Sequence, residues 1–168
     1  RQTVRKLKKI NPGAIILFTG CASQAEPQVA DELPEIDILM GNRNNSEILS
    51  VINKYLENPK FLNAHKKHLR DDSFSGTGIT RFDGHTRAFL KIQDGCDNRC
   101  SYCIIPYLRG KFRSRQMDDV LYEARLLAAS GVKELIVVAQ DTSRYGTDLP
   151  GHKRLLPELL ERLCEIEE

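Results

Sequence analysis

Three cysteines stand close together in the second half of the chain, Cys96, Cys100 and Cys103. Their C-x3-C-x2-C spacing can hold an iron–sulfur cluster by three thiolates and leave one iron without a protein ligand. An open iron is what a small molecule needs if it is to bind the cluster and receive an electron from it. The motif therefore indicates chemistry at a cluster rather than a purely structural role.

Structural zinc is the main alternative, because a Cys-x2-Cys pair is common in zinc sites. Such sites take four ligands, usually as two separated pairs, whereas these cysteines crowd into eight residues with no second pair nearby. Cys21 or His85 remains a candidate fourth ligand for zinc. The sequence shows no signal-peptide pattern and no apolar run long enough to span a bilayer, so we expect a reducing cytoplasmic location, no membrane association and no disulfide.

The overall charge is nearly balanced, with 25 lysines and arginines against 23 acidic residues, which neither requires nor excludes a nucleic-acid partner. Local groups of basic residues indicate possible phosphate contacts. Solvated faces are the alternative reading of the first two groups. The three groups are Arg1, Arg5, Lys6, Lys8 and Lys9; Lys66, Lys67 and Arg70; and Arg109, Lys111, Arg113 and Arg115.

The first part of the chain alternates predicted helices and strands, which favours an open α/β sheet. Cys21 falls where the first strand ends, and ligand sites of such sheets gather at the carboxyl ends of strands. The expected elements are a basic helix over 1–10 that stops at Asn11-Pro12-Gly13, a strand over 14–19, a helix over 26–33, a strand over 36–40, and a helix over 46–56 with Ser46 as its N-cap.

The second part predicts two βα repeats of a parallel barrel, after an interdomain connection over 58–85. The expected elements are a strand over 88–92, a helix over 117–130 closed by Gly131, a strand over 134–139, and a helix over 155–166. A loop after a barrel strand lies at the end of the barrel where catalytic groups collect, and the cysteine loop has this position. Cys164 is expected to be a small buried apolar residue of the last helix.

The segment from Gly95-Cys96 to Arg109-Gly110, followed by Arg113-Ser114-Arg115, resembles the cluster motif of radical S-adenosylmethionine enzymes in its methylthiotransferase version. Thr19-Gly20-Cys21 and Gly41-Asn42 resemble parts of the N-terminal domain of that family. The resemblance implies an internal fragment: residues 1–57 from an N-terminal Rossmann-like α/β methylthiotransferase domain, 58–85 as a linker, and 86–168 as the start of a radical SAM partial TIM barrel.

This resemblance implies that Cys96, Cys100 and Cys103 bind a 4Fe-4S cluster whose open iron chelates S-adenosylmethionine. Cleavage of the sulfonium then gives a 5'-deoxyadenosyl radical that abstracts hydrogen from an unactivated C–H bond. Cys21 would be one ligand of a second 4Fe-4S cluster that delivers sulfur. The family uses three cysteines for that second cluster, and only one cysteine precedes Cys96 in this sequence.

The resemblance also implies four cofactor-binding side chains. Tyr102 would flank the adenine, and Gln140 and Asp141 would stand near the methionine amino group. Arg115 is expected near the active site. For Tyr102, Gln140 and Asp141 the alternative is ordinary loop polarity or packing.

Two branches of the family compete for the substrate. Residues 19–89 resemble members that methylthiolate a modified adenosine next to the tRNA anticodon, and residues 138–146 resemble members that methylthiolate an aspartate of a small-subunit ribosomal protein. We expect tRNA, since the basic N-terminal helix suits phosphate. The expected electron donor is a flavodoxin or ferredoxin. A non-catalytic iron–sulfur or zinc module that binds RNA is the hypothesis from another functional class.

Overall fold

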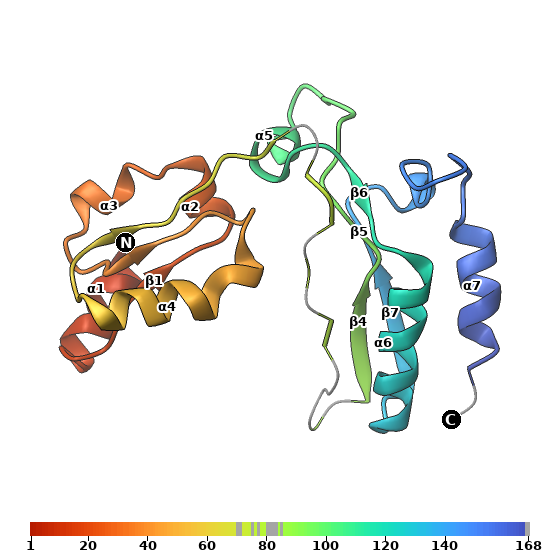
Figure 1. The fold of residues 1–168 in the computed structure, drawn as a ribbon, viewed down its shortest axis with the longest axis horizontal. Coiled ribbons are helices and arrows are strands. Elements are labelled where there is room, and N and C mark those ends of the chain that lie inside the picture. The colour runs from red at the N-terminus through yellow and green to blue at the C-terminus, as the bar shows by residue number, and fades with distance from the viewer. Residues whose placement is uncertain (70–71, 75, 77, 80–83, 85, 167–168) are drawn as a thin grey trace. The chain divides into compact units, whose positions relative to one another are not determined.

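The computed structural model describes residues 1–69, 72–74, 76, 78–79, 84 and 86–166. The chain forms two compact units, one made of residues 1–69 with 107–109 and the other of residues 70–106 with 110–168 (Figure 1). His85, a candidate zinc ligand on sequence grounds, lies outside the described residues.

The N-terminal unit is built on a parallel sheet with strand order β1-β2-β3. Leu17 pairs with Ile38, and Ile38 pairs with Leu62. The strands expected over 14–19 and 36–40 are present but shorter, and β3 lies inside the segment expected to be a linker, where the sequence gives little periodic signal. The bounds are β1 Leu17–Phe18, β2 Ile38–Leu39 and β3 Leu62–Asn63.

The basic helix forms as expected, as α1 Gln2–Ile10. The helix expected over 26–33 is interrupted, because the residue before a proline avoids helical backbone angles and Glu26 precedes Pro27. A helix begins at Cys21 instead. The predicted N-cap Ser46 is also wrong, since Ser46 lies inside a 3-10 turn that precedes the helix. The elements are α2 Cys21–Ala25, α3 Val29–Glu32, η1 Asn45–Glu47 and α4 Ile48–Glu57.

A partly buried carboxylate, Asp37, ties the N-terminal unit together. It accepts hydrogen bonds from Lys8 Nζ at 2.8 Å, the Ile16 N–H at 2.7 Å and the Tyr55 hydroxyl at 3.0 Å. These donors come from α1, from the residue before β1 and from α4. Burial opposes ionisation of Asp37, but the hydrogen bonds from Ile16, Lys8 and Tyr55 outweigh it and lower its pKa.

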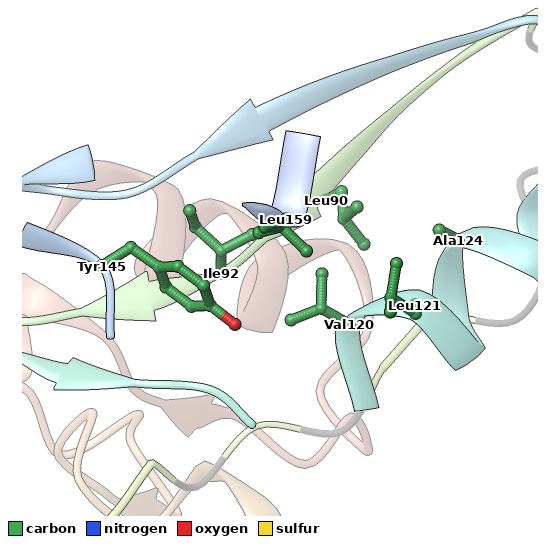
Figure 2. Close-up of a cluster of buried hydrophobic side chains, with 7 residues drawn as sticks. All are labelled: Leu90, Ile92, Val120, Leu121, Ala124, Tyr145 and Leu159. Carbon is green, nitrogen blue, oxygen red and sulfur yellow. The ribbon is translucent and has the colours of Figure 1, made fainter. Parts of the chain in front are cut away.

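The C-terminal unit contains the expected pair of βα repeats. Strands β4 Arg87–Lys91 and β7 Glu134–Val138 are parallel and pair over their whole length. Helices α6 Met117–Ala129 and α7 Leu156–Cys164 follow them. Figure 2 shows the core between these elements, with side chains from β4, α6, α7 and Tyr145 meeting in one apolar cluster. The mixed α/β fold with parallel sheets agrees with the sequence.

Three elements of this unit were not expected from the sequence: β5 Gln93–Asp94, β6 Arg113–Ser114 and the 3-10 turn η2 Thr142–Arg144. A short helix, α5 Ile105–Arg109, also forms after the cysteines. The expectation that Cys164 is buried is wrong, because its side chain is exposed. The buried face of α7 runs through Leu156, Leu159 and Leu163, and Cys164, one residue further, turns away from it.

Candidate functional site

The cysteine loop is closed by an antiparallel stem made of β5 and β6. Gln93 pairs with Ser114 and Asp94 pairs with Arg113. Just inside the stem, the N–H of Cys96 donates to the Gly110 carbonyl at 3.1 Å. Since β5 follows β4 after one residue, both ends of the loop are held at the carboxyl end of a parallel strand, which is where such folds place ligand sites.

Gly95 is the residue that allows the stem to close. Its φ of +79° lies in the left-handed region, and a Cβ there would stand 2.3 Å from the Lys111 carbonyl oxygen and 2.7 Å from that of Gly110. Both neighbours are main-chain atoms, so they cannot rotate away. The position therefore accepts glycine alone without a shift of the backbone.

The three cysteines of the loop are unpaired thiols. Cys96 and Cys103 are partly buried, whereas Cys100 is exposed, and a turn brings the Cys103 N–H to the Cys100 carbonyl at 2.9 Å. Among the described residues, no three Cys, His, Asp or Glu side chains converge so that they could hold one metal ion. An iron–sulfur cluster binds each thiolate through a different iron, so its ligands need not meet at a point, and three thiols on one loop are a donor set that suits such a cluster.

The residues that follow β7 contact the cysteine loop. Gln140 Oε1 accepts a hydrogen bond from the Gly95 N–H at 3.0 Å, and Asp141 Oδ2 accepts one from Asn98 Nδ2 at 2.9 Å. The N–H of Asp141 donates to the side chain of Gln93, which is fully buried, at 3.1 Å. The structure thus brings Gln140 and Asp141, two predicted site residues, to the loop that carries the cysteines.

A third residue of this region, Arg144, was missed by the sequence interpretation. Its Nη1 lies 2.5 Å from Asp97 Oδ1, and its guanidinium carbon lies 3.9 Å from the centre of the Phe112 ring. An arginine in a turn carries no signal by itself. The contact appears only in the fold, where the pairing of β4 with β7 brings the turn after β7 to Asp97, the residue next to Cys96.

The other two predicted cofactor residues, Tyr102 and Arg115, differ in their surroundings. Tyr102 is in the loop, but its side chain is 91% exposed. Arg115 is buried, forms an ion pair with Glu123 of α6, and donates to the carbonyl oxygens of Lys91 at 3.3 Å and Asp119 at 3.1 Å. Its guanidinium therefore links β4 to α6.

Cys21 lies in the N-terminal unit, as the first residue of α2. Gly20 before it has φ of +102°, and Asn42 Nδ2 lies 3.8 Å from the Cys21 sulfur. Asn42 is itself held by the Gln24 side chain, which accepts from its N–H at 3.0 Å, and by His68 Nε2 at 2.7 Å from its Oδ1. The sequence therefore placed Cys21 correctly at the carboxyl end of a parallel strand.

Acidic partners neutralise much of the basic helix α1. Arg1 pairs with Glu32, Arg5 with Glu35 and Lys8 with Asp37, at 2.9, 3.7 and 2.8 Å. Three of the five basic residues in the first group are therefore engaged within the unit. This reduces the positive charge that the helix offers to phosphate.

Comparison with known proteins agrees with this geometry. Residues 90–167 match the sequence model of the radical SAM superfamily. The chain is 49% identical over 153 residues to the ribosomal protein uS12 methylthiotransferase RimO of Pelotomaculum thermopropionicum, and 37% identical over 172 residues to the threonylcarbamoyladenosine tRNA methylthiotransferase MtaB of Aquifex aeolicus. Over nearly its whole length the chain is similar to members of the radical SAM methylthiotransferase family. This family uses 4Fe-4S clusters and S-adenosylmethionine.

The alignments cover 90% of this chain and 34% of the Pelotomaculum relative, and 99% of this chain and 40% of the Aquifex relative. The chain thus spans little more than a third of the length of these methylthiotransferases. In the part of the chain that the structure describes, no helix combines the length and the apolar character needed to cross a bilayer.

Proposed function

We propose that the protein to which this chain contributes inserts a methylthio group at an unactivated C–H bond. The observation that supports this most strongly is the cysteine loop, closed by its stem at the end of β4 and contacted by the residues after β7. In such an enzyme, residues 86–168 begin the radical-generating domain and residues 1–57 belong to the domain that supplies sulfur.

In this proposal Cys96, Cys100 and Cys103 each bind one iron of a 4Fe-4S cluster. Bound there, the cluster supplies an electron to S-adenosylmethionine, and the radical chemistry belongs to the cofactor. The protein holds the loop and orients the cofactor. Cys21 contributes one thiolate toward a second cluster. A cytoplasmic flavodoxin or ferredoxin is the electron donor that we expect.

The side chains near the loop have different roles in this proposal. Gln140 binds the Gly95 N–H and Asp141 binds the Asn98 side chain, so both hold the loop against the end of β7. In the proposal they would also stand near the methionine amino group of the cofactor. The exposed ring of Tyr102 is available to flank the adenine. The buried ion pair with Glu123 favours a structural role for Arg115 over contact with the cofactor.

For the substrate we propose an aspartate of ribosomal protein uS12. The methylthiotransferase of Pelotomaculum thermopropionicum, at 49% identity, and that of Clostridioides difficile, at 41%, are both named for uS12. The argument for tRNA from the basic helix is weakened, because three of its cations are paired with acidic side chains.

A modified adenosine of tRNA is the second candidate. The tRNA methylthiotransferase of Aquifex aeolicus aligns with 99% of this chain, whereas the uS12 relative from Pelotomaculum aligns with 90%. The segment over 19–89 also resembles the tRNA branch. These features favour tRNA as the second candidate.

The test uses the full-length natural protein, reconstituted with iron and sulfide and reduced with dithionite in the presence of S-adenosylmethionine. Purified uS12 and total tRNA are offered in separate reactions and examined by mass spectrometry. Methylthio addition to uS12 alone supports the proposal, and addition to tRNA alone replaces uS12 by the second candidate. A protein that holds zinc and forms no 5'-deoxyadenosine would instead be a non-catalytic module. A Cys100→Ala variant is the control for cluster-dependent turnover.

A further inference from the structure

We propose that Arg144 is a positioning residue that holds the cysteine loop in place for the cluster. This inference rests on the proposed function, because it concerns the loop that carries the cluster ligands. We call the contacts of Arg144 with Asp97, Asn98 and Phe112 the Arg144 bridge.

The Arg144 bridge begins at the acidic residue that directly follows Cys96. Arg144 Nη1 lies 2.5 Å from Asp97 Oδ1 and 3.5 Å from Asn98 Oδ1. The side chains of Arg144 and Asp97 are 31% and 37% exposed, so the pair is only partly shielded from water. The first ligand of the proposed cluster is therefore adjacent to a residue held from outside the loop.

The other end of the bridge is aromatic. The guanidinium carbon of Arg144 lies 3.9 Å from the centre of the Phe112 ring, and Phe112 is only 5% exposed. Phe112 directly precedes β6, on the far side of the loop from Asp97. A fixed ring beneath a guanidinium restricts its orientation and adds a cation–π attraction. Arg144 therefore links the outgoing and returning arms of the cysteine loop.

The turn that carries Arg144 is itself held in place. The N–H of Arg144 donates to the Asp141 carbonyl at 3.3 Å, and the Thr147 hydroxyl donates to the Arg144 carbonyl at 2.9 Å. Asp141 also accepts from Ser143 and from Asn98, both at 2.9 Å. The Arg144 bridge therefore connects the cysteine loop to a turn after β7 that is held by its own hydrogen bonds.

The Arg144 bridge restrains a part of the cysteine loop that the stem does not hold. The stem holds the loop up to Cys96, whereas Cys100 lies beyond it and is exposed. Ligands of a cluster must be held in a fixed geometry if the cluster is to persist. Arg144 and Asp141 contact residues 97 and 98, between the first two cysteines, and so restrain the part of the loop that the stem does not reach.

The first experiment measures amide hydrogen–deuterium exchange of residues 96–104 in the full-length natural protein without its cluster. We expect Arg144→Gln to speed exchange about five-fold, as a partly exposed ion pair and a cation–π contact together would give. The exchange rate of Arg144→Lys should lie between those of wild type and Arg144→Gln. The double variant Asp97→Asn/Arg144→Gln should exchange little faster than Arg144→Gln alone. The matched control is Arg87→Gln, which breaks the exposed ion pair with Glu134. Equal exchange in wild type and Arg144→Gln would overturn the proposal.

The second experiment follows the iron–sulfur absorbance of the reconstituted full-length protein after a chelator is added. Arg144→Gln should lose iron about five-fold faster, Arg144→Lys should recover part of the difference, and Arg87→Gln should behave as wild type. Faster exchange without faster iron loss would show that the bridge does not position ligands and would overturn the proposal. If neither the wild-type protein nor any variant binds a cluster, the proposed function fails. The exchange data still test the Arg144 bridge in that case.

Discussion

Gly95 approaches the main chain of Lys111 so closely that a Cβ at position 95 would lie 2.3 Å from the Lys111 carbonyl oxygen. We therefore expect Gly95→Ala to destabilise the C-terminal unit by about 2–3 kcal/mol, from the positive φ and the clash together. Gly151→Ala is the control, since Gly151 has φ of +92° but nothing within 4 Å of its Cβ position. Urea unfolding measures both. A loss no larger than that of the control would contradict the close approach.

Protonation of Asp37 should destabilise the N-terminal unit. Its pKa is lowered from 3.8 in the folded protein, so the stabilisation from its ionised form is fully present above the unfolded pKa and is lost as the pH falls through the lower folded pKa. Asp37→Asn should cost about 1–2 kcal/mol near neutral pH, because the charged bond to Lys8 is lost.

Unfolding curves between pH 7 and pH 2 measure this effect. The difference between wild type and Asp37→Asn should be constant at neutral pH and should shrink below pH 3.8. Asp31→Asn, at an exposed position of α3, serves as the control. A difference that stays constant down to pH 2 would contradict the assigned hydrogen bonds.

The buried pair of Arg115 and Glu123 predicts a strongly non-additive result. Glu123→Leu alone should destabilise by about 3–5 kcal/mol, because it leaves the guanidinium buried without its partner. The double variant Arg115→Met/Glu123→Leu should recover most of this loss, since neither charge remains. Denaturant unfolding of the two single variants and the double variant gives the coupling free energy. Additive effects would show that the two side chains act independently.

The cysteines of the loop and of α7 should differ in iron binding. Replacing Cys96, Cys100 or Cys103 by alanine should in each case remove most of the cluster proposed for the C-terminal unit, because each change takes away one of its three proposed thiolate ligands. Cys164→Ala should leave the iron content unchanged, although that thiol is also exposed. Iron analysis with ultraviolet–visible spectra measures both outcomes. Iron loss in Cys164→Ala equal to that in Cys100→Ala would argue against the assignment.

The sequence predicted the elements whose pattern is local and periodic. The strands β4 and β7 were predicted from apolar runs, α6 ends before Gly131, and α1 ends at Ile10, just before Asn11. The cysteine spacing is equally local, which is why the sequence alone predicts a cluster at this loop.

What the sequence missed depends on contacts between distant residues. The stem of β5 and β6 joins segments about twenty residues apart through two pairs, too few to leave a periodic signal. Likewise, β3 consists of Leu62 and Asn63 and is defined by its pairing with β2. The roles of Arg115 and Arg144 depend on which acidic residue each meets, and neither Glu123 nor Asp97 could be chosen before the fold was known.

The stem also has an evolutionary consequence. Because β5 and β6 bring the two ends of the cysteine loop together, the chain enters and leaves this region at nearly the same place. Residues inserted or deleted between Cys103 and Gly110 would change the length of the cysteine loop without shifting the register of β4 against β7. Lengthening such a loop carries only a small entropic cost. The length of the loop can therefore vary while β4 and β7 keep their register.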